Sequence, residues 1–284
     1  MNSRISIILL CTILLTGSFG IALPKAFALV TPSLGAADPF GILASTYTNT
    51  VAGTSITGDL GYTTGPAVSP LVSGVTHIAD ATYAQAGLDQ GTALAALNSE
   101  PCDFNFVGAI DLSSLTQPLV PGVYCSSGAM DIGGGGTVTL SGAGIYVFRP
   151  DGALTTSANS IVTLSGGADA CDVFWTPTAA TTLGADSKFI GTDIDASGIT
   201  VGSTVTWTGR ALAFGGTVST DIDTITVPTC QTPPNGVVGG TIIPIDMTSL
   251  FVVGAMTNAF WMMPTIGGVA VVAIALFKVK RKSS

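Results

Sequence analysis

The sequence predicts a mostly β fold: a parallel β-solenoid with one long α-helix packed alongside it. The first observation is a degraded repeat between residues 122 and 227. The second is that each repeat alternates β-branched and small polar residues between Gly, Asn or Asp, a pattern typical of short strands and tight corners. The third is composition, because 47% apolar and only 9% charged residues favour a packed body over disorder.

The repeat has the length of one solenoid coil. Residues 128–130 lead to residues 137–140, and 24 residues later residues 152–156 lead to residues 161–164. The pattern returns three more times, and the starts lie about 18 to 27 residues apart. No unit can bury its apolar side alone, so the units are expected to stack. The side chains expected to point inward are Val138, Leu140, Val162, Leu164, Val205, Trp207, Ile225 and Val227.

Residues 1–28 are predicted to be a secretory signal peptide. Arg4 precedes an apolar run from Ile5 to Leu15, and residues 26–28 (AFA) form a small-x-small cleavage site. The alternative is an uncleaved anchor helix, for which the apolar run is short. Residues 29–230 are then expected to form the solenoid domain.

One soluble helix is predicted, beginning after Thr76 or Asp80 and ending near Asn98. Small residues recur there at helical spacing and predict a narrow face that can lie close to a sheet. The residues of this predicted face are Ala81, Ala84, Leu88, Gly91 and Ala95.

Four cysteines remain once Cys11 is removed with the signal peptide: Cys102, Cys125, Cys171 and Cys230. An even number in an exported protein predicts two disulfides, for which three pairings are possible. Cys102 with Cys125 is favoured because about one coil separates them, and Cys171 with Cys230 because this bond would fix the last strand to the body. The spacings match no zinc motif.

The C-terminal part predicts a membrane anchor. Residues 231–249 form a Pro/Gly-rich linker, residues 250–277 are almost wholly apolar, and residues 278–284 carry four basic side chains. This order predicts one transmembrane helix with a cytoplasmic basic tail, and therefore an ectodomain outside the cell. The alternative, a buried core helix, does not explain the basic cluster.

The charge pattern excludes several partners. The net charge is −8, but six of the nine basic residues lie in the two terminal segments, which leaves Arg149, Lys188 and Arg210 against all 17 acidic residues. Such a surface repels nucleic acid and anionic membranes.

Six ordered motifs resemble the microbial ice-binding (antifreeze) protein family. They are residues 40–44 (FGILA), 56–61 (ITGDLG), 121–124 (PGVY), 148–156 (FRPDGALTT), 173–177 (VFWTP) and 207–213 (WTGRALA). The resemblance covers about residues 31–230. It implies a discontinuous, right-handed β-helix of triangular cross-section in which N-terminal strands join the later ones, a helix packs along one face, and a flat exposed face binds ice.

Catalysis finds little support. His77 is the one histidine and Glu100 the one glutamate, and Ser/His/Asp chemistry would depend on His77 alone. Two aspartate pairs, Asp193 with Asp195 and Asp221 with Asp223, are compatible with a polysaccharide-cleaving or calcium site, but solvated corners are the favoured interpretation. Residues 133–136 (GGGG) are expected to form a corner and not a phosphate-binding loop. No enzyme activity, cofactor, metal or small-molecule substrate is predicted.

Rows of exposed threonine are the remaining candidates. Ice offers no charge to attract, so a binder needs a flat, rigid surface, and Thr supplies a methyl and a hydroxyl group on a stiff stem. The favoured ice-binding face carries Thr155, Thr156, Asn159, Thr182, Thr200, Ser203, Thr217, Ser219 and Thr220. A second face carries Thr137, Thr139, Thr163, Thr206, Thr208, Thr224 and Thr226, with Lys188 and Ile190 interrupting it.

The sequence therefore predicts a protein displayed at the cell surface that adsorbs to ice, to inhibit recrystallisation or to attach the cell to ice. Exposed Thr is also the ordinary residue of solvent-facing strands. The alternatives are accordingly a surface adhesion or structural module that binds glycan or protein, and a carbohydrate-active enzyme that depends on the aspartates.

Overall fold

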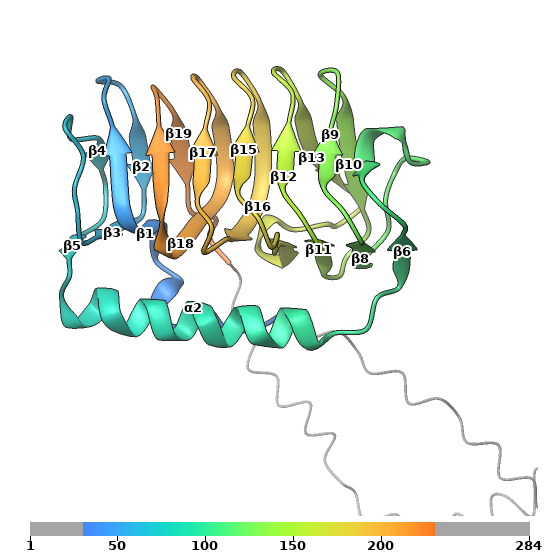
Figure 1. The fold of residues 1–284 in the computed structure, drawn as a ribbon, viewed down its shortest axis with the longest axis horizontal. Coiled ribbons are helices and arrows are strands. Elements are labelled where there is room, and N and C mark those ends of the chain that lie inside the picture. Colours follow the sequence, from blue (N-terminus) through green and yellow to red (C-terminus); the bar gives the residue numbers. More distant parts are fainter. Residues whose placement is uncertain (1–30, 231–284) are drawn as a thin grey trace, which may run out of the picture. The chain divides into compact units, whose positions relative to one another are not determined.

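The computed structural model describes residues 31–230 (Figure 1). The predicted signal peptide (1–28), linker (231–249), transmembrane segment (250–277) and basic tail (278–284) lie outside the described residues. Within residues 31–230, no helix combines the length and the apolarity needed to cross a bilayer.

Nineteen strands pair in parallel and wind into stacked coils, so the predicted solenoid is confirmed. Each coil presents three faces, which we call the helix face, the first face and the second face. The helix face contains β6 (Phe104–Phe106), β8 (Gly122–Ser126), β11 (Tyr146–Pro150), β14 (Val173–Trp175), β3 (Asp59–Tyr62) and β5 (Thr76–Ile78).

The first face follows the helix face along each coil, and the second face follows the first. The first face contains β7 (Ile110–Asp111), β9 (Met130–Ile132), β12 (Leu154–Thr156), β15 (Thr181–Leu183) and β17 (Ile199–Val201). The second face contains β10 (Thr137–Ser141), β13 (Ile161–Ser165), β19 (Thr224–Thr226), β2 (Ser55–Thr57) and β4 (Leu71–Val72). Three longer strands turn a corner between faces: β1 (Phe40–Asn49), β16 (Lys188–Ile194) and β18 (Thr206–Thr220).

The stack does not follow the order of the chain. Strand β1 pairs with β18, and β2 pairs with β19, so the N-terminal coils lie beyond the C-terminal strands. Strand β6 lies at the opposite end, and α2 (Ala81–Ser99) crosses between the two ends (Figure 1). At 1.5 Å per residue this helix covers about 28 Å, the width of roughly six strands at 4.8 Å. Residues distant in sequence therefore share one sheet.

Helix α2 begins where the sequence predicts but buries a different face. The Asp80 carboxylate caps its N-terminus by accepting the Tyr83 N–H at 2.8 Å. The predicted small-residue face was wrong, because Leu88 is 66% exposed. The buried residues are Tyr83, Ala86, Gly87, Gln90, Ala93 and Leu97. Gly87 decides the contact, since a Cβ there would overlap the Phe214 ring.

Two cores hold these layers together. Inside the coils, a column of aromatic rings in stacked, tilted or edge-to-face contact runs along the axis with centroid distances of 4.1 to 5.2 Å. Its members are Phe104, Tyr124, Phe148, Trp175, Phe189 and Trp207. Most residues predicted to point inward are buried, but Leu164 and Val227 are only half-buried. A second cluster fills the space between α2 and the helix face and contains Leu43, Phe174 and Leu212. Close packing of this kind makes the body rigid.

Both predicted disulfides are confirmed, Cys102 with Cys125 and Cys171 with Cys230. They close loops of 23 and 59 residues. In the chain-entropy model, such loops each stabilise the folded state by about 3 to 4 kcal/mol.

The corner between the first and second faces is a ladder of tight turns. The same turn position has a positive φ in successive coils: 62° at Asn159, 59° at Asp186, 63° at Thr204 and 59° at Ile222. Backbone hydrogen bonds link the turns, for example from Asn159 N to Ala185 O at 2.9 Å. Asn and Asp tolerate this conformation, whereas the β-branched Ile222 is strained in it.

Replacing Ile222 with Gly is expected to raise the free energy of unfolding by about 1 kcal/mol, because Gly adopts a positive φ without strain. Ile222 is 43% exposed, so little packing is lost. Chemical denaturation of the purified domain measures the change. Asn159→Gly is the matched control, with an expected change near zero; an equal gain in both variants would show that strain at Ile222 is not the cause.

Candidate functional site

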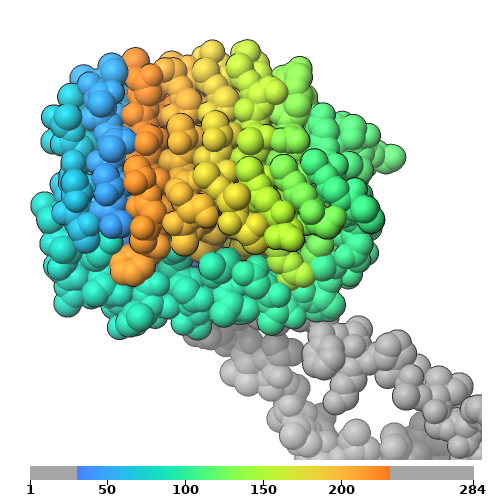
Figure 2. All heavy atoms as spheres, in the orientation of Figure 1, coloured from blue at the N-terminus to red at the C-terminus, as the bar shows by residue number. Residues whose placement is uncertain are grey.

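The first face presents a continuous row of small polar side chains. Backbone register places Asp131 beside Thr155, Thr155 beside Thr182, Thr182 beside Thr200, Thr200 beside Ser219, and Ser219 beside Thr48. Neighbouring strands of a sheet lie about 4.8 Å apart, so the row repeats at that distance. Figure 2 views this face, where blue β1 atoms lie directly beside orange β18 atoms on one continuous surface.

Exposure along the row is uneven. Thr182 and Thr200 are exposed, whereas Thr155 and Ser219 are half-buried. The Thr155 hydroxyl donates to the Asp131 carboxylate, and the Thr48 hydroxyl donates to Ser219 Oγ at 2.8 Å. The centre of the row therefore offers the most accessible methyl and hydroxyl groups, and its ends are tied by side-chain hydrogen bonds.

A second, shorter row runs beside the first. Thr217 lies beside Thr46, and Thr46 forms an isolated bridge with Thr64. Toward the other end this row continues as Gly198, Ala180 and Ala153, which follows from the same register. Small side chains keep this part of the surface level.

Two of the predicted face residues are buried, so placing them on the exposed face was wrong. Thr156 is 7% exposed and its hydroxyl accepts the Gly184 N–H at 2.9 Å. Thr220 is 5% exposed and its hydroxyl lies 2.8 Å from the Tyr47 hydroxyl. Successive residues of a strand point to opposite sides, so Thr155 and Thr156 cannot both face outward.

Two further predicted residues lie at the corner and not in the row. Asn159 occupies the exposed turn position with positive φ. Ser203 is half-buried in the equivalent turn of a later coil, where its hydroxyl donates to the Asp221 carboxylate. The structure therefore brings Thr155, Thr182, Thr200, Thr217 and Ser219 together and separates Asn159 and Ser203 from them.

Sequence reasoning missed Thr46 and Thr48. They extend the two rows by one coil, although about 170 residues separate them from their partners on β18. Their signal was the alternation in residues 45–50 (STYTNT), in which Thr46 and Thr48 flank the buried Tyr47. The alternation did not reveal that β18 is the strand beside β1.

The second face also carries threonine rows, but they are broken as predicted. Thr206 lies beside Thr224, and Thr208 lies beside Thr226. On the next strand Lys188 and Ile190 lie in register with Thr206 and Thr208. The exposed ammonium group of Lys188 and the larger Ile190 side chain interrupt both rows.

Three of the four paired aspartates are not solvated, so that interpretation was wrong for them, whereas the fourth, Asp221, is half-buried at a corner. Asp193, Asp195 and Asp223 are at most 1% exposed. Asp195 accepts the N–H groups of Thr181 and Ser197 at 2.8 and 2.7 Å, and Asp223 accepts the Val205 N–H at 2.8 Å. These carboxylates fix the turns between coils.

Asp193 differs, because neither of its carboxylate oxygens has a hydrogen-bond partner among the described residues. Burial and then the nearby Asp195 charge raise its pKa well above the ordinary value. Burial raises the pKa of Asp223 to about 6. A buried neutral carboxyl group with no access to solvent is suited to a structural role and not to substrate chemistry.

The histidine also has a structural position. His77 Nδ1 lies 2.7 Å from the Asp80 carboxylate, the group that caps α2, and Nε2 lies 3.6 Å from Asp59. Among residues 31–230, no group of three or more His, Cys, Asp or Glu side chains is arranged to hold a metal ion.

Comparison with known proteins identifies this architecture. The family model described as ice-binding-like matches residues 42–226. The chain belongs to the ice-binding-like family. It is 34% identical over 232 residues to an ice-binding protein from Nostoc. The alignment covers 78% of this chain and 82% of the relative. It is 30% identical to an ice-binding protein from Flavobacterium frigoris, over 69% of this chain and 76% of the relative.

Solved ice-binding structures share the fold. The ice-binding protein of the Antarctic ascomycete Antarctomyces psychrotrophicus superposes with a TM-score of 0.65 at 33% identity, covering 71% of this chain and 100% of that one. An ice-binding protein from an Antarctic biological consortium gives the same TM-score at 31% identity. That superposition covers 72% of this chain and 95% of the other. The solenoid and helix of this ice-binding-like chain thus correspond to a complete chain of known structure.

Proposed function

We propose that this protein adsorbs to ice through its first face. The observation that carries the proposal is the row Thr155, Thr182, Thr200, Ser219 and Thr48, which is contributed by successive coils of one parallel sheet in a member of the ice-binding-like family. Relatives described as ice-binding proteins support it.

The mechanism follows from what the row presents. Each threonine offers a methyl group that water cannot hydrogen-bond and a hydroxyl group that it can. In a rigid sheet these groups hold the adjacent water in a regular array, so little ordering entropy remains to be lost when that layer joins the crystal. Every single contact is weak, and adsorption depends on many contacts at once. The protein acts without turnover.

The adsorbing surface is proposed to combine the first strand of the solenoid, β1, with strands from its C-terminal part. Thr46 and Thr48 of β1 and Thr217 and Ser219 of β18 form a block of four hydroxyl side chains. Thr182 and Thr200 continue it toward β12, and the row of hydroxyl groups ends at Asp131, which carries a carboxylate in place of a hydroxyl.

We further propose that the protein is exported and held at the cell membrane by residues 250–277, with the solenoid outside the cell. The sequence pattern of an apolar segment followed by four basic residues supports this location. A tethered protein cannot protect bulk fluid, so attachment of the cell to ice, or control of ice at the cell surface, is the favoured role.

The domain covering residues 29–235 tests the function directly. Added to a growing single ice crystal, it is expected to shape the crystal and to inhibit recrystallisation in a frozen sucrose solution. The heat-denatured domain is the control. Crystals that grow as rounded discs at every protein concentration would refute ice adsorption, and binding on a glycan array would then support the adhesion alternative.

A further inference from the structure

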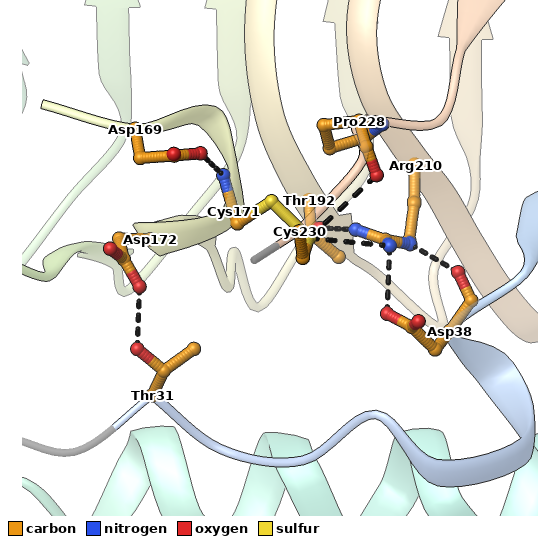
Figure 3. Close-up of a disulfide and its surroundings, with 9 residues drawn as sticks. All are labelled: Thr31, Asp38, Asp169, Cys171, Asp172, Thr192, Arg210, Pro228 and Cys230. Carbon is orange, nitrogen blue, oxygen red and sulfur yellow. Dashed lines mark hydrogen bonds and ion pairs between the residues drawn. A yellow bond between two sulfur atoms is a disulfide. The ribbon is translucent and has the colours of Figure 1, made fainter. Parts of the chain in front are cut away.

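Both ends of the described body are fastened to one short element, η3 (Ala170–Asp172). At the N-terminal end, the Thr31 hydroxyl donates to the Asp172 carboxylate at 2.5 Å. At the C-terminal end, Cys230 forms a disulfide with Cys171 (Figure 3). Element η3 lies between β13 of the second face and β14 of the helix face. It therefore occupies the corner of the solenoid that lies opposite the first face.

A buried arginine adds to this attachment. Arg210 is 1% exposed and its guanidinium donates to the Asp38 carbonyl and carboxylate oxygens, both at 2.7 Å. Its Nη2 also lies 3.8 Å from Cys230 Sγ (Figure 3). The segment before β1 and the segment after β19 thus meet on one side chain of β18.

The strand next to the C-terminal exit is poorly suited to resist a pull. Strand β19 has only three residues, and it pairs with β18 on one side and β2 on the other. After it, the Val227 N–H donates to the Thr57 carbonyl at 2.9 Å. Tension that reached this strand would break its hydrogen bonds one after another and separate β18 from β2, although both belong to the stack that supports the first face.

We propose that the Cys171–Cys230 disulfide is a tension clasp. It passes a pull on the chain after residue 230 directly to η3 and β14, and so it spares β19. The pull arises when ice holds the first face while the membrane holds the C-terminal segment, so the inference rests on the proposed function.

Single-molecule pulling on the full-length chain in detergent tests the clasp. One handle is attached at the C-terminus and the other through an azide-bearing residue at Ala158, an exposed turn position between the first and second faces. In Cys171→Ser/Cys230→Ser we expect the first rupture at about half the wild-type force or less, with an early extension step from β19, because forced opening is governed by the unfolding rate. In Cys102→Ser/Cys125→Ser, which removes the disulfide outside this path, the first rupture is expected to be unchanged.

Equal first-rupture forces in the wild type and the clasp variant would overturn the proposal, as would an equal loss in both disulfide variants. If the clasp variant does not fold, the Cys102→Ser/Cys125→Ser protein is folded oxidised and then reduced on the instrument, since Cys171–Cys230 is the disulfide it retains within residues 31–230. An ice-shaping assay on residues 29–235 carrying Cys171→Ser/Cys230→Ser separates the tension clasp from ice adsorption. If the variant shapes ice and its first rupture force is lowered, both the tension clasp and ice adsorption are supported. If the first rupture force is lowered but the protein does not shape ice, ice adsorption is refuted and the tension clasp is not.

Discussion

Tyrosine at positions 182 and 200 is expected to abolish crystal shaping and recrystallisation inhibition. Thr182 and Thr200 are the exposed centre of the row on the first face and lie in register. A tyrosine ring rises above the level of the neighbouring side chains, so it keeps the rest of the row from the ice surface. Because adsorption depends on many weak contacts made together, two such obstacles remove nearly all of it.

The fold is expected to survive, since exposed substitutions of this kind usually change the free energy of unfolding by no more than about 0.5 kcal/mol. Thermal denaturation of the variant checks this point. The matched control is Thr206→Tyr/Thr224→Tyr, which places the same two rings on exposed, registered positions of the second face. Full ice activity in the Thr182/Thr200 variant would exclude the first face, and loss only in the control would transfer the proposal to the second face.

Asn at position 193 is expected to stabilise the domain at pH 7 by about 1 to 3 kcal/mol, the usual cost of a buried polar group without a partner. Asp193 is fully buried, and its two oxygens and the Thr181 hydroxyl find no hydrogen-bond partner in the described part of the chain. Burial, reinforced by the charge of Asp195, raises its pKa well above the ordinary value. An amide is neutral without taking up a proton, and its N–H groups can donate to the Thr181 hydroxyl.

The same group makes stability depend on pH. Above pH 4 the unfolded chain has released the Asp193 proton, whereas the folded protein retains it, so the folded state binds more protons and stability falls as the pH rises. The raised pKa of Asp195 and that of Asp223, at about 6, act in the same direction. Urea denaturation of the wild type is therefore expected to show a decline from pH 4 toward pH 8 that is smaller in Asp193→Asn.

Asp195→Asn is the matched control for position 193. The Asp195 carboxylate accepts two backbone N–H groups, from Thr181 and Ser197, and an amide has only one oxygen to offer. This variant is expected to be less stable than the wild type. A loss of stability in Asp193→Asn at pH 7 would contradict the burial argument, because it would mean that the charged carboxylate is satisfied in the folded protein.

Local patterns predicted much of this architecture. The alternation in residues 137–140 and 161–164 placed Val138 and Val162 inside, and the favoured one of the three possible cysteine pairings is the one that forms. The choice of helix face failed because the exposed and the buried stripes recur with the same period. The buried stripe is identified by its tertiary contacts, in which Tyr83 and Gly87 pack against Phe214. The buried aspartates were misplaced because a polar residue between turns has the same pattern whether it faces solvent or accepts N–H groups inside the corner.

By itself, the sequence determined the coil, because a period of about two dozen residues built from alternating strands has to stack its apolar sides to bury them. It also determined which type of side chain covers the exposed sheets. The tertiary structure alone decided which of those side chains become neighbours. Helix α2 carries the chain across the stack, so that β1 completes a sheet with β18, and a surface made of Thr48, Ser219 and Thr200 exists only after that long-range pairing. The physical reason is that strands pair through backbone hydrogen bonds, which any two strand edges can form. The connecting segment, here helix α2, therefore fixes which strands become neighbours.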